Sequence, residues 1–387
     1  MARFLFVVPP LVGHVNPATG VAAELAARGH HVAWAGHEPL LHRLAGPDAE
    51  IFGCAVPETA PARGADLKGP AALRFLWEEF LIPLADAMTP GVHAAIDAFA
   101  PHVVVADQQA LSGGLVAEAR GLPWVTSATT SAELIDPLAG MPKVAAWVDE
   151  LLTGLRIRIG DGRGTADPRF SPHGVLAFTT RRLLGAAELP PEVWLVGPSI
   201  TARLSTTDFP WSWLEPESPT VLVTLGTANA DAAAGFLTAA AAAFEGADRR
   251  AVVVDPGGVL GEVAENVLVC REVPQLPLLA RMDAVVCHAG HNTVCEALWH
   301  GVPLVVAPIR DDQPIVAGQV ADAGAGVRLR FGRADSARIG AAVETVLTEP
   351  GYRRAAAAVG RSFRAAGGAP AAAGHLEQLA RLGAPVR

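Results

Sequence analysis

The sequence predicts an α/β protein built from two doubly wound, Rossmann-like domains that face each other across a cleft. The chain has 387 residues, too many for one ordinary core and suited to two domains of roughly 150–200 residues each. Short apolar runs alternate with helical stretches in two successive series, a pattern typical of parallel sheets covered by helices on both faces. A segment rich in proline, serine and threonine separates the two series.

The first series predicts an N-terminal domain over residues 1–200. An apolar run at 3–9 ends in prolines, a loop follows to Pro17, and a helical pattern runs to Arg28 before the next strand. This order of strand, loop, helix and strand builds parallel sheets. The strands expected here are 3–9, 31–35, 103–106 and 124–126, with a helix over 111–119.

The second series predicts a C-terminal domain over residues 219–387, after a linker at 201–218. The alanine-rich tail at 336–382 predicts two or three helices, of which the last can pack back on the first domain. In such sheets ligands bind at the carboxyl ends of the strands, so the cleft between the domains is the expected site. The strands expected here are 221–224, 251–254, 267–270, 284–287, 304–307 and 327–329.

Composition excludes several classes of protein. A hydrophobic fraction of 51% with 18% charged residues excludes a disordered chain. The net charge of −9 argues against a nucleic-acid partner. Four cysteines without a CxxC pair fit a reducing compartment and give neither a disulfide framework nor a zinc site. No GxGxxG follows a strand and GxxxxGK[ST] is absent, so neither hydride transfer nor P-loop chemistry is expected.

The mean hydropathy of +0.31 fits a buried, helix-rich α/β protein. The uncharged run at 4–23 contains Pro9, Pro10 and Pro17, which would break a membrane-spanning helix. The run also lacks the charged start and the cleavage site of a signal peptide. We therefore expect a cytoplasmic protein without a membrane partner, either a monomer or a homodimer.

The segment from His288 to Gln313 is the most informative part of the chain. A strand ends at His288, Gly290 turns the chain, and Asn292 and Thr293 fall in the first turn of a helix. A helix start offers unpaired amide hydrogens and a partial positive charge, so it binds phosphate groups. The amide and hydroxyl groups add neutral donors, and His288 can add a charged one. Glu296, one turn later, can reach a ribose hydroxyl.

Other interpretations of this segment remain open on the residues alone. Asn292 can merely cap the helix, with the histidines incidental. His288 and His291 together can ligate zinc, although no clear third ligand lies near them in the sequence.

In the first domain, Gly13-His14 follows the first strand and is expected on a loop that faces the cleft. A neutral imidazole is a suitable base for a hydroxyl near neutral pH. Asp107 ends the strand at 103–106 on the same edge of the sheet. It can hydrogen-bond the far nitrogen of His14 and fix its tautomer, or it can cap the following helix. On the residues alone, a non-catalytic role for His14 and for Asp107 stays open.

Large aromatic residues of the first domain can line an apolar pocket, although most such residues belong to the core. The irregular segment at 127–170 is where the choice of the molecule bound beside His14 is expected to be encoded. The candidate lining residues are Phe75, Trp77, Phe80, Trp124 and Trp147.

The chain resembles the antibiotic-macrolide and flavonoid glycosyltransferases, inverting enzymes of the GT-B fold, along its whole length. The strongest part of the resemblance is 273–313, and Gly13-His14 and 224–227 add to it. The resemblance implies a catalytic base at His14 with Asp107 as its partner. It also implies the contacts to the nucleotide-sugar donor. The diphosphate is contacted by Thr227, His288, Asn292 and Thr293, and the ribose by Glu296. Gln275 contacts the base or the ribose, and Asp312 and Gln313 contact the sugar hydroxyls.

Two positions depart from the family pattern. Glu272 stands where relatives commonly carry an aromatic residue stacked on the nucleobase, and Val316 stands where they often carry asparagine. A lost stacking ring removes about 1–3 kcal/mol of binding energy. The departures leave both TDP and UDP open as the nucleotide, without touching the diphosphate contacts.

The resemblance implies an inverting, metal-independent transfer of a hexose or deoxysugar from a TDP-sugar or UDP-sugar co-substrate, with no further cofactor, to a lipophilic acceptor. No DxD motif is present, and Asp311-Asp312 is a weak metal candidate. Two alternatives stay open: a nucleotide-sugar epimerase, and a non-catalytic partner of another glycosyltransferase.

Overall fold

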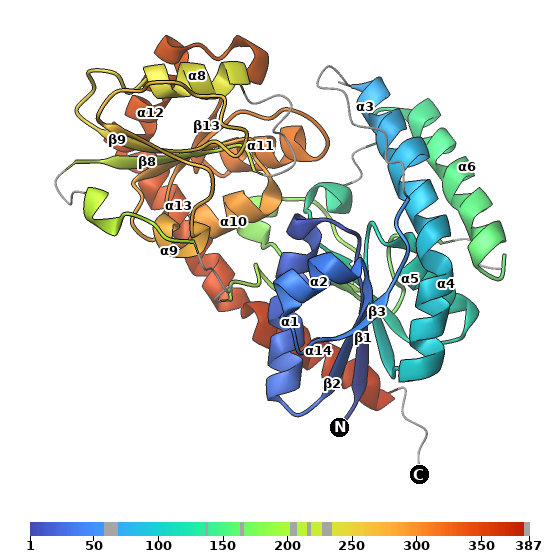
Figure 1. The fold of residues 1–387 in the computed structure, drawn as a ribbon. Helices are drawn as coiled ribbons and strands as arrows, with labels where there is room; N and C mark the ends of the chain where they lie inside the picture. The colour runs from blue at the N-terminus through green and yellow to red at the C-terminus, as the bar shows by residue number, and fades with distance from the viewer. Residues whose placement is uncertain are drawn as a thin grey trace.

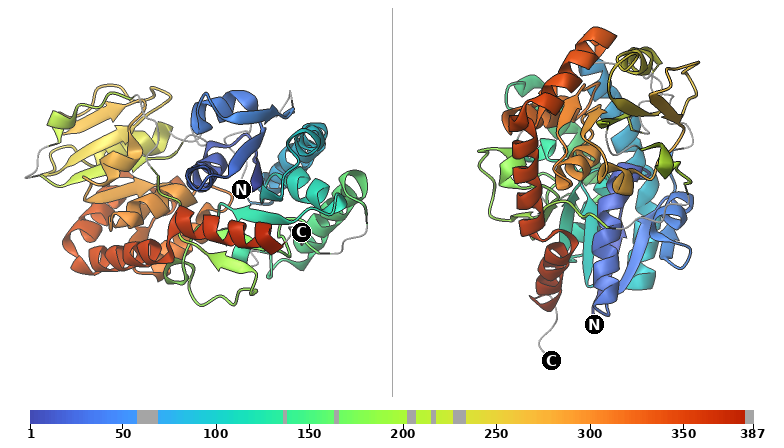
Figure 2. Two further views of the ribbon diagram at one scale, coloured as in Figure 1. Left: turned by 90° about the horizontal axis from the view of Figure 1, so that it is seen from below. Right: turned by 90° about the vertical axis from the view of Figure 1, so that its left-hand side faces the viewer.

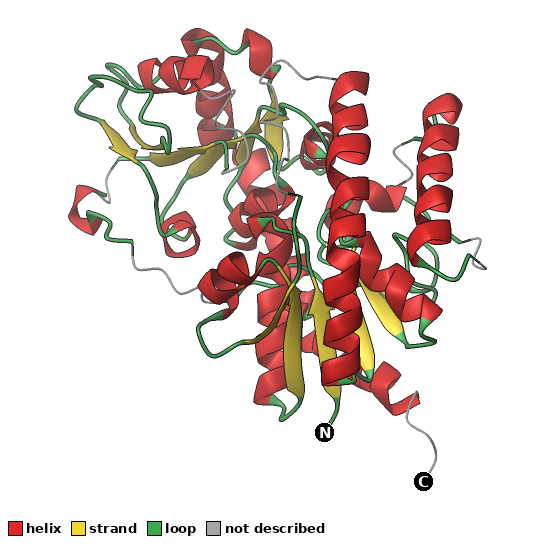
Figure 3. Cartoon of the chain, turned by 45° about the vertical axis from the view of Figure 1, so that its right-hand side comes forward, coloured by secondary structure: helices red, strands yellow, loops and turns green. Residues whose placement is uncertain are grey.

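The computed structural model describes residues 1–57, 69–135, 138–162, 166–201, 207–214, 218–226 and 234–382. The chain forms two parallel sheets, one with seven strands and one with six, which lie in two separate lobes (Figure 1; strands yellow in Figure 3). This confirms the predicted α/β class with two Rossmann-like domains. Among the described residues, no helix is both long and apolar enough to cross a lipid bilayer.

The first sheet has the strand order β3-β2-β1-β4-β5-β6-β7. Its central strands are apolar and buried, as expected for a sheet covered on both faces. Three short strands, β3, β6 and β7, were not predicted. The strands are β1 (Arg3–Val7), β2 (His31–Gly36), β3 (Glu50–Gly53), β4 (Val103–Asp107), β5 (Trp124–Ala128), β6 (Val175–Ala177) and β7 (Val193–Leu195).

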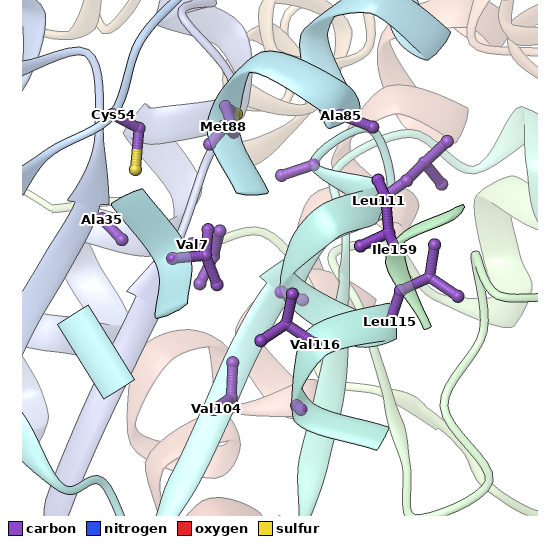
Figure 4. Close-up of a cluster of buried hydrophobic side chains, with 14 of the residues drawn as sticks. Val7, Ala35, Cys54, Ala85, Met88, Val104, Leu111, Leu115, Val116 and Ile159 are labelled. Carbon is purple, nitrogen blue, oxygen red and sulfur yellow. The ribbon is translucent and has the colours of Figure 1, made fainter. Parts of the chain in front are cut away.

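Helices pack on both faces of this sheet. One face forms a core with α4, α5 and α6, where Val7 and Val104 of the sheet meet Met88 and Leu115 of the helices (Figure 4). A π-helix precedes α4 and borders the cleft. The helices are α1 (Val12–Ala27), α2 (Glu38–Ala45), α3 (Pro70–Arg74), η1 (Phe75–Leu81), α4 (Ile82–Phe99), α5 (Leu111–Ala119), η2 (Ala132–Ile135), α6 (Pro142–Ile159) and α7 (Arg181–Leu184).

Helix α1 begins at Val12, earlier than predicted, and contains Pro17. The expectation of a loop up to Pro17 was wrong, so His14 lies in the first turn of a helix. Proline inside a helix removes one backbone hydrogen bond, the one to the carbonyl four residues before it. For Pro17 that acceptor is the Gly13 carbonyl, which is bonded instead by a side chain of the second lobe, as described below.

The second sheet has the order β10-β9-β8-β11-β12-β13 and repeats the winding of the first. The strands are β8 (Thr220–Thr224), β9 (Arg250–Val254), β10 (Val267–Cys270), β11 (Ala284–Cys287), β12 (Leu304–Val306) and β13 (Gly326–Arg328). The helices are η3 (Trp211–Trp213), α8 (Ala234–Ala242), α9 (Gln275–Leu279), α10 (His291–Trp299), α11 (Gln313–Asp322), η5 (Phe331–Arg333), α12 (Ser336–Thr348), α13 (Pro350–Ala366) and α14 (Gly368–Leu382).

The last helix, α14, returns to the first lobe. Its apolar side chains, such as Leu376, are buried in one cluster with Phe4 and Val21 of β1 and α1, and it lies against the first lobe in two further views (Figure 2). The turn between α13 and α14 has Gly367 at φ 95°, and the amide of Gly368 donates to the Val196 carbonyl at 2.7 Å. The C-terminal helix therefore ties the two lobes together.

Both sheets place a crevice at the point where the strand order reverses. In the first sheet, β1 and β4 are neighbours whose connections leave in opposite directions, and in the second sheet β8 and β11 are the equivalent pair. Ligands of open parallel sheets bind outside the carboxyl ends of such strands. His14 follows β1, Asp107 ends β4, and His288 follows β11, so the chain presents these residues at the two crevices.

Candidate active site

A cleft of about 2020 Å³ is lined by residues of both lobes. Of the residues singled out in the sequence, most line this cleft: His14, Phe75, Trp77, Phe80, Gln275, His288, Gly290, Asn292, Thr293, Glu296, Asp312 and Gln313. Thr227 falls outside the described residues. The parallel topology has therefore brought together side chains that are separated by up to about three hundred positions along the chain.

On the first lobe, His14 and Asp107 form a hydrogen-bonded pair. The Nδ1 of His14 lies 2.9 Å from Oδ1 of Asp107, whose side chain is completely buried while that of His14 is 16% exposed. Thr129, at the end of β5, completes the network: its hydroxyl lies 2.8 Å from His14 Nδ1 and donates to Asp107 Oδ2 at 3.2 Å. When Nδ1–H donates to the carboxylate, Nε2 carries the lone pair and is available to accept a proton from a molecule in the cleft.

Asp107 does not cap the following helix. Its Oδ1 also accepts a hydrogen bond from the Gln109 amide at 2.8 Å, while α5 begins at Leu111 without a side-chain cap. The Gln109 contact fixes the carboxylate in the loop after β4, and the fixed carboxylate in turn fixes the imidazole of His14. The geometry thus excludes the capping alternative for Asp107.

The charge of Asp107 changes the basicity of His14. Burial alone would lower the pKa of His14, but the charge and hydrogen bond of Asp107, with a contribution from the charge of Asp312, raise it above its usual value of 6.5. A raised pKa makes the neutral imidazole a stronger proton acceptor. The buried carboxylate therefore both orients the ring and increases its affinity for a proton.

On the second lobe, the start of α10 is free of side-chain caps. Gly290 is the N-cap residue, no acidic residue lies in the first turn, and Ala289 before it adopts a positive φ of 67°. The first amide hydrogens of an α-helix have no partner within the helix. Asn292 and Thr293 of this turn line the cleft together with Gly290, so an anion in the cleft can reach unpaired amides.

His288 lies beside this helix start, fixed by two glycines. A Cβ on Gly290 would come within 2.4 Å of His288 Nε2, and a Cβ on Gly226 would come within 2.8 Å of its Cε1. The imidazole therefore fits only because both positions lack a side chain. Its Nδ1 is buried without a hydrogen-bond partner of normal geometry in the part of the chain that is described.

Burial lowers the pKa of His288 to about 4, against a small opposite effect of the Thr224 backbone. The lowered pKa favours a neutral imidazole here rather than the charged donor suggested by the sequence. The ring is neutral at pH 7 and offers one N–H. A buried neutral donor still forms a charge-assisted hydrogen bond when its acceptor is an anion.

Both ring nitrogens of His291 have protein partners. Its Nδ1 lies 3.3 Å from the Ser131 hydroxyl, and its Nε2 lies 3.2 Å from the Phe178 carbonyl and 3.4 Å from Cys295 Sγ. Both ring nitrogens thus connect α10 to the first lobe. Within the described ranges, no group of three or more histidine, cysteine, aspartate or glutamate side chains could hold a metal ion.

Deeper in the second lobe, Gln275 at the start of α9 donates to Glu296 of α10, with 2.6 Å between Nε2 and Oε2. Both residues line the cleft, and Glu296 is 1% exposed. Glu272 accepts a hydrogen bond from the Thr207 hydroxyl at 2.7 Å. Val316 is fully buried in the core of this lobe, so it offers the cleft no polar group.

Asp312 and Gln313 lie at the start of α11. The carboxylate of Asp312 does not cap its own helix but accepts from the Thr130 hydroxyl of the first lobe, at 2.6 Å. The Oε1 of Gln313 accepts the amides of Ile309 and Arg310 at 2.9 and 3.1 Å. Burial raises the pKa of Asp312, opposed by the hydrogen bond from Thr130. Both side chains are therefore held in place at the wall of the cleft.

The helix starts of the two lobes are joined directly. Asn292 Nδ2 donates to the Gly13 carbonyl at 2.6 Å, the acceptor that Pro17 leaves free in α1. This bond places the first turn of α1, with His14, against the first turn of α10. The catalytic candidate and the diphosphate candidates thus lie at one hydrogen-bonded junction.

The aromatic candidates separate into two groups. Phe75, Trp77 and Phe80 line the cleft, whereas Trp124 does not. Trp124 is 3% exposed in the core of the first lobe, where its ring would be 2.8 Å from a Cβ on Gly114. The expectation that Trp124 contacts an acceptor was wrong, because large aromatic residues on a central strand fill the helix–sheet interface.

Trp147 also lies away from the cleft lining, and its Nε1 donates to Glu78 at 3.2 Å.

Two site residues were missed in the sequence, Thr129 and Thr130. The run Thr126-Ser127-Ala128-Thr129-Thr130-Ser131 at the end of β5 was the available signal, since polar residues at a strand's carboxyl end face the ligand crevice.

Comparisons with known proteins agree with this geometry. Residues 248–379 match the family model described as Erythromycin biosynthesis protein CIII-like, C-terminal domain. The chain is 32% identical over 401 residues to 4'-demethylrebeccamycin synthase of Lentzea aerocolonigenes, covering 91% of this chain and 93% of that protein.

Two solved structures share the whole architecture. The calicheamicin glycosyltransferase CalG4 superposes with a TM-score of 0.82 at 24% identity, over 100% of both chains. The spinosyn rhamnosyltransferase SpnG complexed with thymidine diphosphate has a TM-score of 0.76 at 25% identity, over 97% of this chain and 100% of that chain. With the two lobes, the shared cleft and these matches, the chain belongs to the antibiotic and natural-product glycosyltransferases of the GT-B fold.

Proposed function

We propose that the protein transfers a hexose or deoxysugar from a TDP-sugar or UDP-sugar to a hydroxyl group of a lipophilic small molecule, with inversion and without a metal ion. The observation that carries this proposal is the pairing across one cleft of a carboxylate-oriented histidine with an uncapped helix start. His14 is bonded to Asp107 at 2.9 Å, and the first turn of α10 lies opposite, joined to it through Asn292 and Gly13.

The proposed reaction uses His14 as the general base. As the acceptor oxygen attacks the anomeric carbon, its proton passes to Nε2 of His14, and the bond from that carbon to the diphosphate oxygen breaks. Asp107 stabilises the imidazolium that forms. Attack from the face opposite the leaving group inverts the anomeric carbon, and the protonated histidine then releases its proton to water.

The leaving nucleoside diphosphate gains negative charge during this step. The amides at the start of α10, the Thr293 hydroxyl and the His288 ring are placed to stabilise that charge, as electrostatic preorganisation requires. These neutral donors take the part that a divalent metal plays in other transferases. Thr227, by its resemblance to the family, is a further proposed phosphate contact.

The remaining contacts follow from position in the cleft. Glu296, paired with Gln275 at 2.6 Å, is the proposed ribose acceptor, because a buried carboxylate accepts hydroxyl hydrogens well. Asp312 and Gln313 are the proposed contacts of the sugar hydroxyls. Thymidine diphosphate, seen in the spinosyn rhamnosyltransferase relative, is one of the two nucleotides proposed.

The epimerase and the non-catalytic alternatives make different predictions. An epimerase interconverts donor sugars without an acceptor, and a non-catalytic partner releases no nucleotide at all. The test is incubation with TDP-glucose or UDP-glucose and a panel of phenolic, polyketide and macrolide alcohols. We expect nucleoside diphosphate release only with an acceptor, together with a product of hexosyl mass increment and an inverted anomeric centre by NMR. Release of nucleotide with retained configuration would overturn the inverting mechanism.

A further inference from the structure

The acceptor side of the cleft contains one charged pair that the proposed reaction does not use. Glu133 lies in the short helix η2 (Ala132–Ile135), three residues after Thr130, which bonds Asp312. Its Oε2 accepts a hydrogen bond from Arg169 at 2.5 Å. Both Glu133 and Arg169 line the cleft, in the half that also contains Trp77.

The guanidinium of Arg169 is held by a second carboxylate and by two aromatic rings. Asp167 accepts from its Nε and terminal nitrogen at 3.0 and 2.6 Å, and the group packs against Trp77 and Phe170 with 5.7 and 5.6 Å to the ring centroids. Such a planar, multiply bonded guanidinium loses little further freedom. Arg169 therefore acts as a fixed support that orients Glu133.

Glu133 retains an acceptor that faces the cleft. Its bond to Arg169 uses only Oε2, and none of the described residues is a hydrogen-bond partner of Oε1, which is not enclosed. Two carboxylates, Glu133 and Asp167, share one guanidinium, so the cluster carries one excess negative charge. Burial raises the pKa of Glu133, and the charge of Arg169 opposes that rise.

We propose that Glu133, positioned by Arg169, is an acceptor-binding residue that selects molecules with a protonated amine or similar cationic nitrogen. An apolar acceptor that fills the cleft displaces water from Oε1 and leaves it unpaired, which is costly. An ammonium group replaces that water with a charge-assisted bond and balances the excess charge. A cation beside Glu133 also lowers its pKa, against the effect of burial. The inference rests on the proposed function, since it assigns the acceptor of that same cleft.

The nearby groups favour a cation over an anion. Asp312 lies close enough to Glu133 for its charge to raise the Glu133 pKa, and Asp312 itself is tied to Thr130. Arg169, the cation that bonds Glu133, is already bonded to two carboxylates. An anionic acceptor would therefore meet net negative charge, and a neutral one would leave an oxygen without a partner.

The test compares binding of matched acceptors to the whole protein, in the presence of TDP. Each pair consists of one aromatic or polyketide alcohol that carries a primary aminomethyl group and the same molecule with an ethyl group there. Dissociation constants come from quenching of tryptophan fluorescence and from calorimetry. We expect the wild type to bind the amine member roughly 10- to 100-fold more tightly.

Glu133→Gln keeps the shape and removes the charge, so it should abolish that preference. Glu150→Gln, on the exposed face of α6, is the matched control and should keep it. A wild type without preference, or Glu133→Gln with the full preference, would overturn the proposal. A wild type without the preference overturns the proposal even if Glu133→Gln fails to fold.

A thermal shift with TDP alone separates this proposal from the proposed function. If TDP stabilises the protein but the amine preference is absent, the role of Glu133 is wrong and the donor site stands. If neither TDP nor UDP binds, the proposed function fails, whatever the acceptor pairs show.

Discussion

Replacing Gly290 by alanine tests whether the His288 ring position matters for the nucleotide. The backbone at Gly290, with φ −61° and ψ 133°, suits alanine, so no conformational strain is expected there. The new Cβ would lie 2.4 Å from His288 Nε2 and 2.8 Å from Cε1, closer than carbon and nitrogen atoms approach. The ring must move, and the close approach of Gly226 to the same ring leaves it little room.

The expected magnitude follows from one lost hydrogen bond. A bond between His288 and an anionic diphosphate contributes about 1.5–3 kcal/mol, so its loss weakens binding roughly 10- to 150-fold. Isothermal titration of TDP and UDP against the wild type and Gly290→Ala measures this. The combination with His288→Ala should add little, because both changes remove the same contact.

Gly261→Ala is the matched control. Its Cβ would meet nothing within 4 Å, and it should leave nucleotide affinity unchanged. Equal TDP affinity of Gly290→Ala and the wild type, with unchanged melting temperatures, would refute the placement of the diphosphate beside His288.

Three further predictions concern the base, the junction of the lobes and the metal. Because the pKa of His14 is raised, kcat/KM should fall on acidification through a pH above 6.5. Asp107→Asn should move this acidic limb of the pH profile to lower pH and reduce the plateau value of kcat/KM roughly 10²- to 10⁴-fold. An unmoved limb would exclude a functional pairing of Asp107 with His14. Pro17→Ala gives the Gly13 carbonyl a backbone partner within α1, in competition with Asn292. We expect kcat to fall about 5-fold, the equivalent of one hydrogen bond of about 1 kcal/mol, while the melting temperature rises. An unchanged kcat would show that the junction does not position the base. Excess EDTA should leave turnover intact, and loss of turnover that magnesium restores would contradict metal independence.

Sequence patterns predicted the central strands and the residues at their ends. Continuous apolar runs such as 221–224 and 284–287 form strands because a parallel sheet is buried on both faces. Since parallel strands share one carboxyl edge, His14 and Asp107 were expected to meet from positions 93 residues apart, and they lie 2.9 Å from each other. The sheet topology alone was therefore enough to predict the contact between His14 and Asp107.

The features that were missed depend on contacts between distant segments. The start of α1 at Val12 was hidden by Pro17, whose missing amide is harmless only because Asn292 bonds the free Gly13 carbonyl. Thr130 could not be assigned, since its partner Asp312 lies 182 positions away in the other lobe. For Trp124, composition gives no sign of which side of the sheet a large ring will fill.

Turnover by His14→Ala is the most direct test of the proposed division of labour between the lobes. The variant removes the imidazole that Asp107 orients, while the nucleotide contacts on α10 stay intact. We predict a loss of roughly 10²- to 10⁴-fold in acceptor-dependent nucleotide release, with TDP affinity close to that of the wild type. Turnover near the wild-type rate would contradict the assignment of His14 as the base.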